Sequence, residues 1–368
     1  MLDSRVERLA RVMTEYSLEI KPGDRVVISG GALAEPLLRA SYRHALALGG
    51  LPLLDVQLPG ATEILLRDGT DEQLGVISPV ERFASEDADC WLRVSAATNT
   101  RSLSGIDPAR QRAHGKARAA VRQAYLDRAA SGALRWSSTV FPTEAYAQDA
   151  DMSLEEYEEF VFRAEKLDDP DPVASWRAVG VYQGQLIDWL TPRHAVHVAG
   201  PDTDLRLQVG GRTWINSDGH RNFPSGEVFT GPLEDSAEGH VRFTYSSIMQ
   251  GREVEGVQLW FEHGKVVRAT AAKNQEFLES MLNSDAGARY LGEFAFGTNR
   301  DITRFTGNTL FDEKIGGTVH MALGSGYPDS GSLNRSAIHW DLICDLRQGG
   351  EVTVDGEVFV RDGQFTVQ

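Results

Sequence analysis

The sequence lacks several features that mark whole classes of protein. None of its hydrophobic runs reaches the ~18 residues that a membrane-spanning helix needs. Residues 1–24 carry several arginines and no apolar core of a secretory signal, so we expect a cytoplasmic protein. There are two cysteines, Cys90 and Cys344, which lie far apart and outside any CxxC motif. This pattern favours free thiols in a reducing compartment over a disulfide framework.

Basic residues are scarce relative to acidic ones. The formal net charge of −16 argues against nucleic-acid binding through a basic surface, because phosphate contacts need clustered lysine and arginine. Gly30 and Gly31 follow a strand pattern and precede a helical one, but the full GxGxxG fingerprint of a dinucleotide site is missing. We therefore expect no nucleic-acid partner and no membrane partner, and we interpret these glycines as part of a turn.

What is present is an ordinary globular composition, 41% hydrophobic and 24% charged. A chain of 368 residues exceeds the roughly 250–300 residues of a single core, which predicts two domains. Residues 1–192 alternate strand and helix patterns, for example strands at 25–29 and 51–56 around a helix at 35–48, which predicts an open α/β sheet flanked by helices. Residues 193–368 show short strands and tight turns, which predict a mainly antiparallel β (α+β) catalytic domain.

Candidate metal ligands gather between Asp312 and Asp341. His339 and Asp341 are two residues apart in the β-forming run 337–343, so a strand would send both side chains to one face, where both can reach one cation. Carboxylates and neutral imidazoles are ligands that Zn²⁺, Co²⁺ and Mn²⁺ accept. A His-x-Asp pair alone is equally compatible with a solvated polar strand face.

Two glutamates further upstream strengthen the metal hypothesis. Glu227 lies in the block Pro-Ser-Gly-Glu-Val-Phe-Thr and Glu293 in the block Tyr-Leu-Gly-Glu, both apolar and rich in glycine. A carboxylate buried there without a partner would be costly, so both glutamates call for a cation. The segment that follows Glu313 contains His320 in Gly-Thr-Val-His-Met-Ala-Leu-Gly, and Tyr327 in Gly-Tyr-Pro.

Together these blocks resemble the thermophilic metalloprotease family of dimetallic aminopeptidases, of the aminopeptidase T and aminopeptidase S type. The resemblance runs over nearly the whole chain and is densest from Val198 to Phe365. It implies a broad-specificity homodimer with Tyr327 as a catalytic residue beside two divalent metal ions. The metal ligands that it implies are Glu227, Glu293, Glu313, His320, His339 and Asp341.

The expected reaction is the release of N-terminal amino acids from peptides. A metal-bridging hydroxide can form because bound metals lower the pKa of water from ~15.7 toward ~7. It would attack the first peptide bond of a substrate with a free N-terminus, while Tyr327 donates a hydrogen bond to the developing oxyanion. Either Glu293 or Glu313 would bridge the metals or carry a proton to the leaving amine.

Two alternatives stay open at this stage. One is another dinuclear metal-dependent amide hydrolase, and the other is a non-catalytic metal-binding protein. Tyr327 argues against the second, because a structural metal site has closed coordination and needs no proton donor beside it.

Overall fold

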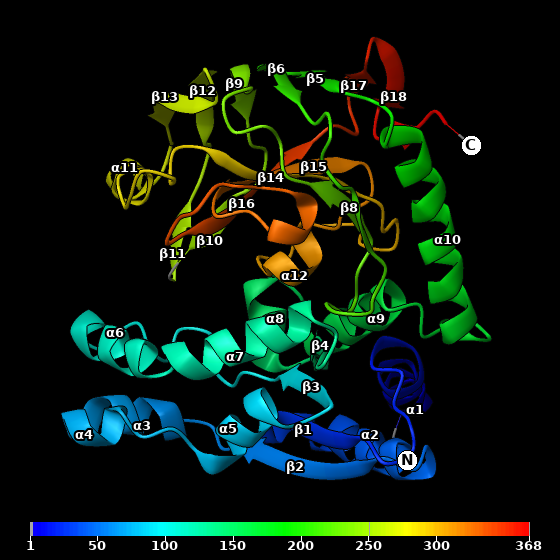
Figure 1. Cartoon of the computed structure of the whole chain (residues 1–368), viewed down its shortest axis with the longest axis vertical. Coiled ribbons are helices and arrows are strands. Elements are labelled where there is room, and N and C mark those ends of the chain that lie inside the picture. The colour runs from blue at the N-terminus through cyan, green and yellow to red at the C-terminus, as the bar shows by residue number, and fades with distance from the viewer. Residues whose placement is uncertain (1–2, 250, 368) are drawn as a thin grey trace. The chain divides into compact units, whose positions relative to one another are not determined.

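The computed structural model describes residues 3–249 and 251–367, which divide into two compact units. The first unit comprises Met1–Ser175 with Gly219–Pro224, and the second comprises Trp176–Asp218 with Ser225–Gln368. Each unit is built on sheets of its own (Figure 1). Among the described helices, none combines the length and the apolar character that a membrane crossing requires.

The first unit contains a four-stranded parallel sheet in the order β2-β1-β3-β4. This confirms the expected open α/β layer. Its strands are β1 (Arg25–Gly31), β2 (Leu51–Gln57), β3 (Cys90–Ser95) and β4 (Arg135–Val140). Its helices are α1 (Ser4–Arg11), continued by the π-helical turn Val12–Ser17, α2 (Glu35–Ala47), α3 (Ala61–Asp68), α4 (Asp71–Leu74), α5 (Pro79–Glu86), α6 (Pro108–Ala117), α7 (Ala119–Ala130), α8 (Glu144–Asp149) and α9 (Leu154–Ala164).

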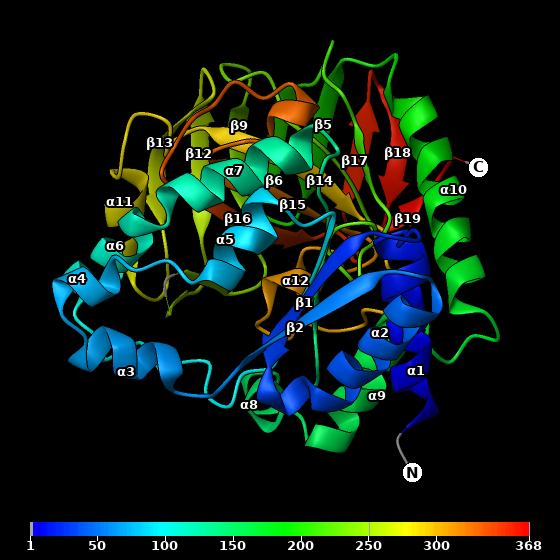
Figure 2. The same ribbon diagram turned by 60° about the horizontal axis from the view of Figure 1, so that its bottom comes forward.

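Helices pack against both faces of the inner strands of this parallel sheet. Figure 2 shows β1 and β2 side by side with α2 next to them, and Leu38 of α2 lies over Gly30 of β1. On the opposite face Val27 and Trp91 pack against α5, and Tyr125 of α7 meets the Trp91 ring edge-on at 5.9 Å. The inner strands β1 and β3 therefore follow the rule that parallel sheets are buried on both sides, whereas the edge strand β2 is exposed or half-buried along its whole length.

Gly30 and Gly31 close the first strand without forming a phosphate-binding loop. A Cβ at either position would lie 2.7 Å from a backbone oxygen of the β3 segment, Val94 O or Ala96 O. The two glycines therefore allow the backbones to approach closely, and the short 3₁₀ turn Ala32–Ala34 leads directly into α2.

The second unit is built from antiparallel sheets, as expected. An eight-stranded sheet has the order β13-β12-β9-β6-β5-β17-β18-β19, a five-stranded sheet has the order β16-β15-β14-β8-β7, and β10 and β11 form a separate pair. The first sheet comprises β5 (Ala195–Gly200), β6 (Thr203–Gln208), β9 (Glu238–Arg242), β12 (Gln258–Glu262), β13 (Lys265–Thr270), β17 (Glu351–Val354), β18 (Glu357–Arg361) and β19 (Gln364–Phe365). The remaining elements are β7 (Ile215–Ser217), β8 (Glu227–Thr230), β10 (Ser247–Met249), β11 (Arg252–Val254), β14 (Leu291–Gly297), β15 (Thr318–Gly324), β16 (His339–Asp345), α10 (Pro172–Leu190), α11 (Gln275–Leu282) and α12 (Thr309–Asp312).

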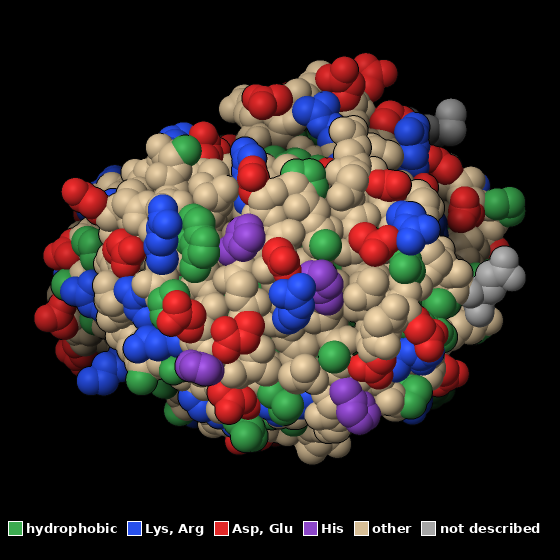
Figure 3. All heavy atoms as spheres, turned by 90° about the horizontal axis from the view of Figure 1, so that it is seen from above, with side chains coloured by type: hydrophobic (Ala, Val, Ile, Leu, Met, Phe, Trp, Pro, Cys, Tyr) green, Lys and Arg blue, Asp and Glu red, His purple; other side chains and the backbone are tan. Residues whose placement is uncertain are grey.

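One hydrophobic core joins the two larger sheets of the second unit. Phe294, Met321 and Trp340 extend from the five-stranded sheet into the same buried cluster as Leu205 and Phe359 of the eight-stranded sheet. The solvent face of the eight-stranded sheet carries histidines and charges of both signs, with hydrophobic side chains scattered among them (Figure 3). Because the core side chains of the five-stranded sheet lie on one of its faces, the other face is left for polar groups.

The boundary between the two units along the chain falls within helix α10. We expected the domain boundary between residues 192 and 193, after this helix, whereas the compact units divide at Ser175 and Trp176, near its start. Leu186 and Leu190 belong to the core of the second unit. The helical pattern predicts that α10 forms, but it carries no information about which sheet the apolar face covers.

Phe296 offers a test of how far the second unit depends on this core. Its side chain is almost fully buried, and its ring lies 5.0 Å from Phe359 and 5.1 Å from Phe294. We expect Phe296→Ala to lower the free energy of unfolding by about 3–5 kcal/mol, measured by denaturant titration of metal-free protein. The control Val267→Ala, at a half-exposed position of β13, should change it by less than about 0.5 kcal/mol. Equal losses in the two variants would contradict this account of the core.

Candidate metal centre

Four neighbouring strands of the five-stranded sheet carry most of the candidate ligands. Glu227 begins β8, Glu293 lies on β14, His320 on β15, and His339 and Asp341 on β16. The strand register places Ala322 of β15 opposite both Glu293 and Asp341. Those two carboxylates therefore flank the same position of β15, although 48 residues separate them along the chain (341 − 293).

Successive side chains of each strand point to opposite faces of this sheet, and the two faces carry different kinds of side chain. On β15, Val319 and Met321 point into the hydrophobic core, so His320 and Ala322 face the opposite side. Ala295, the partner of His320 on β14, is also small. Small side chains between the ligands leave space next to the carboxylates and the imidazole.

Both histidines are oriented by a backbone carbonyl. Nδ1 of His320 donates to the carbonyl of Glu313 at 2.8 Å, and Nδ1 of His339 donates to the carbonyl of Ser325 at 2.7 Å. These contacts leave Nε2 of each ring as the nitrogen that faces the carboxylates. Nε2 of His320 lies 3.2 Å from Oε1 of Glu293, and Nε2 of His339 lies 3.4 Å from Oδ1 of Asp341.

Two overlapping groups of side chains are compact enough to hold a metal ion. The ligand atoms of Glu227, Glu293 and His320 all lie within 4.8 Å of one another, and so do those of Glu313, His320 and Asp341. His320 belongs to both groups. His339 belongs to neither, but it lies beside them, with Nε2 3.7 Å from Oε2 of Glu293.

The donor atoms fit a divalent cation. In the cluster of candidate ligands, three buried carboxylate oxygens have no hydrogen-bond partner among the described residues, namely Oε2 of Glu227, Oε2 of Glu293 and Oδ1 of Asp341. Leaving such oxygens unsatisfied is expensive, and oxygen and imidazole donors without a thiolate suit Zn²⁺, Co²⁺ or Mn²⁺.

The electrostatics of the cluster reflect crowded negative charge. Burial raises the pKa of Glu227, Glu293 and Glu313. Burial alone would lower the pKa of His320, but its hydrogen bond with Glu293 and the nearby carboxylates outweigh burial and raise that pKa to about 9. Burial alone would raise the pKa of Asp341, but the neighbouring His339, His320 and Lys314 together outweigh burial and lower that pKa. The group as described therefore attracts positive charge strongly.

Glu313 reaches the cluster from outside the strands. It follows α12 directly, at the C-terminal end of that four-residue helix, and its carbonyl is the one that orients His320. One glutamate therefore supplies both a candidate metal ligand and the acceptor that fixes the neighbouring imidazole.

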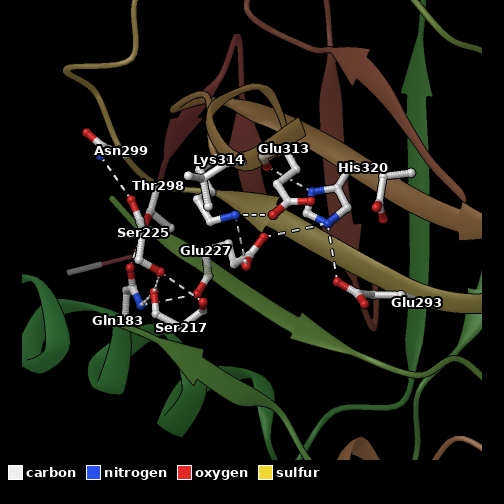
Figure 4. Close-up of polar contacts among 12 residues, drawn as sticks. Gln183, Ser217, Ser225, Glu227, Glu293, Thr298, Asn299, Glu313, Lys314 and His320 are labelled. Atoms are coloured by element: carbon white, nitrogen blue, oxygen red, sulfur yellow. Dashed lines mark hydrogen bonds and ion pairs between the residues drawn. The ribbon is translucent and has the colours of Figure 1, made fainter. Parts of the chain in front are cut away.

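Two residues outside the predicted ligand set contact the candidate ligands. Lys314 is fully buried, pairs with Oε1 of Glu313 and lies 3.6 Å from Oε1 of Glu227 (Figure 4). Gln183 of α10 donates to the Glu227 carbonyl at 3.1 Å and accepts a hydrogen bond from Thr298 at 2.8 Å. The adjacency of Lys314 to Glu313 was a weak signal in the sequence, whereas Gln183 carries no recognisable motif.

Tyr327 lies beside the cluster on the loop between β15 and β16. Its ring meets the His339 ring edge-on at 5.3 Å and lies 5.5 Å from the ring of Phe229, and about half of the side chain is exposed. Partial burial, followed by the charge of Glu293 and the other carboxylates, raises the pKa of the phenol, which therefore keeps its proton near neutral pH.

Asn334 anchors the loop that carries Tyr327. Its side-chain amide donates to the carbonyls of Gly287 at 2.9 Å, Gly324 at 2.7 Å and Tyr290 at 3.3 Å. One buried side chain therefore ties the loop to the end of β15 and to the segment that leads into β14.

Comparison with known proteins identifies the family of this chain. The model of the thermophilic metalloprotease (M29) family matches residues 2–365. The chain belongs to this family. The metalloprotease is 27% identical to Aminopeptidase 2 of Geobacillus stearothermophilus, over 100% of this chain and 98% of that protein. It is 31% identical to Aminopeptidase T of Thermus aquaticus, over 71% of each chain.

Solved structures support the same relationship. The metalloprotease superposes on wild-type AmpT from Thermus thermophilus with a TM-score of 0.84 and 25% identity, over 99% of both chains. It also superposes on 2,5-dihydroxypyridine dioxygenase from Pseudomonas putida KT2440 with a TM-score of 0.58 and 14% identity, which shows a common fold alone. Since that fold also occurs in a protein described as a dioxygenase, the fold by itself does not decide the chemistry.

Because His320 belongs to both groups of candidate ligands, its substitution tests the ligand set. We expect His320→Ala to lose metal from both groups, whereas Asp341→Ala should lose it mainly from the group that contains Glu313. Metal per chain would be measured by elemental analysis after dialysis. His240→Ala, in the eight-stranded sheet, is the control and should keep the wild-type metal content. Two metals per chain in His320→Ala would rule out this assignment.

Proposed function

We propose that two divalent cations serve the metal-dependent aminopeptidase activity of this chain. The observation that carries the proposal is that three buried carboxylate oxygens without a hydrogen-bond partner each face an imidazole Nε2. Oε2 of Glu227 lies 3.6 Å from Nε2 of His320, and Oε2 of Glu293 and Oδ1 of Asp341 lie 3.7 Å and 3.4 Å from Nε2 of His339. The residues proposed as ligands are Glu227, Glu293, Glu313, His320, His339 and Asp341.

Bound at these residues, the cations would polarise the scissile carbonyl and activate water for attack on it. The protein's own part is to hold the ligands in place. Glu293 reaches both histidines, with Oε1 3.2 Å from His320 and Oε2 3.7 Å from His339. Glu293 would therefore help to hold the cations together with both histidines.

Tyr327 is proposed as the catalytic hydrogen-bond donor. Its raised pKa keeps the hydroxyl protonated, and its contact with His339 places it at the edge of the ligand cluster. A donor of this kind, aimed at the oxyanion, contributes about 2.7–4 kcal/mol to transition-state stabilisation.

The proposed substrates are peptides with a free N-terminus. A free amine in its neutral form can bind to a cation through its lone pair, whereas the nitrogen of an acylated amine cannot, because its lone pair is delocalised into the amide. The names of the relatives as aminopeptidases support this choice over a general amide hydrolase. The homodimer and the cytoplasmic location implied by the sequence remain part of the proposal, as does the choice among Zn²⁺, Co²⁺ and Mn²⁺.

A paired substrate panel tests the proposed reaction. We expect hydrolysis of aminoacyl-anilides and no hydrolysis of the same compounds with an acylated amine. A chelator should abolish the activity, and added Zn²⁺, Co²⁺ or Mn²⁺ should restore it, because oxygen and nitrogen ligands do not select sharply among these ions. Full activity of the metal-free protein, or equal rates on acylated substrates, would refute the proposal.

Tyr327→Phe tests the proposed hydrogen-bond donor. The variant removes only the hydroxyl, so kcat and kcat/KM should fall together by roughly 10²–10³ while KM and metal content stay near wild type. Tyr182→Phe on α10, at a similarly exposed position, is the matched control and should leave both rates unchanged. A near-normal kcat in Tyr327→Phe would show that the tyrosine only packs in its turn, and loss of a metal would assign it to the ligand scaffold instead.

A further inference from the structure

A fully buried lysine lies within the ligand cluster. The side chain of Lys314 has 0% exposure, which is rare for lysine because removing an ammonium from water is costly unless it is paired. Its backbone is fixed as well, since its N–H donates to Phe311 O at 3.0 Å and its carbonyl accepts from Asn299 N–H at 3.1 Å. The lysine is therefore a rigid part of the site.

The ammonium joins the two compact ligand groups. Glu227 belongs to one group and Glu313 to the other, and Lys314 contacts Oε1 of both. The other oxygen of Glu227, Oε2, points toward His320 at 3.6 Å and accepts no hydrogen bond from any described residue. One oxygen of Glu227 is thus directed at the lysine and the other at the imidazole of His320 (Figure 4).

We propose that Lys314 is a positioning residue of the metal centre, which holds Oε1 of Glu227 and of Glu313 so that each carboxylate offers a single oxygen to a cation. This inference rests on the proposed function, because it presupposes that the cluster binds metal. Carboxylates bind cations through one oxygen or through both. An ammonium on one oxygen selects the first mode and fixes the direction in which the other oxygen points.

The two carboxylates depend on Lys314 to different degrees. Glu227 lies on a strand, its carbonyl accepts from Gln183, and Ser217 donates a hydrogen bond that helps to lower its pKa. Glu313 lies at the end of a four-residue helix, and its carboxylate is paired with Lys314. Loss of the ammonium should therefore disturb the group of Glu313, His320 and Asp341 more than the other group.

A competing interpretation makes the opposite prediction. If Lys314 were only a positive charge that competes with the cations for the carboxylates, its removal would strengthen metal binding. If it positions the carboxylates, its removal weakens binding at one of the two positions. The sign of the affinity change therefore separates the two interpretations.

The experiment is a titration of Co²⁺ into metal-free Lys314→Met, which keeps an unbranched side chain and loses the ammonium. We expect two equivalents in wild type and, in the variant, one of the two bound roughly 10–100-fold more weakly. The visible absorption of Co²⁺ should also change, because a carboxylate freed to bind through both oxygens raises the coordination number. Lys273→Met is the matched control, since Lys273 also pairs with two glutamates, Glu253 and Glu255, but on the surface.

The outcomes are distinct. Wild-type affinity and an unchanged spectrum in Lys314→Met, or tighter binding, would overturn the inference and leave the proposed function intact. Failure of the wild-type protein to bind any metal would overturn the proposed function itself. If Lys314→Met does not fold, a crystal structure of the metal-loaded wild type decides: Lys314 should contact Oε1 of both glutamates, and a carboxylate bound through both oxygens would overturn the inference.

Discussion

The burial of several carboxylates at one place is the constraint on which the rest of the second unit depends. Four carboxylates lie close together around His320, those of Glu227, Glu293, Glu313 and Asp341. Like charges in a medium of low polarity repel strongly. Two oriented imidazoles and the ammonium of Lys314 lie next to these carboxylates and reduce the repulsion between them. The negative charge that these groups leave uncompensated gives the site its affinity for cations. The fold must also be stable enough to hold the carboxylates together against their mutual repulsion.

The five-stranded sheet meets this demand because its two faces differ completely. One face contributes phenylalanine, methionine and tryptophan side chains to a core shared with the eight-stranded sheet, and burial of that apolar surface provides the stability. The other face carries the ligands with alanine between them. Backbone hydrogen bonds connect β8, β14, β15 and β16, so ligands far apart in sequence are held in one rigid frame.

The sequence predicted local features of this site better than distant ones. The pairing of His339 with Asp341 follows from the strand period, and the structure places them together on β16. No spacing rule brings Glu227 next to His320, since a sheet can order its strands in many ways; only the family resemblance connected them. The contact of Lys314 with Glu227 was missed for the same reason, and the assignment of α10 to the second unit depended on packing that its helical pattern does not encode.

The anchoring of the Tyr327 loop by one amide also bears on how the protein ages. Asn334 donates both of its amide hydrogens, and Asp at that position, the product of slow deamidation, would present only acceptors to carbonyl oxygens that are acceptors themselves. Asparagine is among the residues that heat damages chemically, and thermophilic proteins use fewer of them. Replacement of this one amide by a carboxylate, on prolonged storage or heating, would therefore release the loop, while both sheets and the metal ligands stay intact.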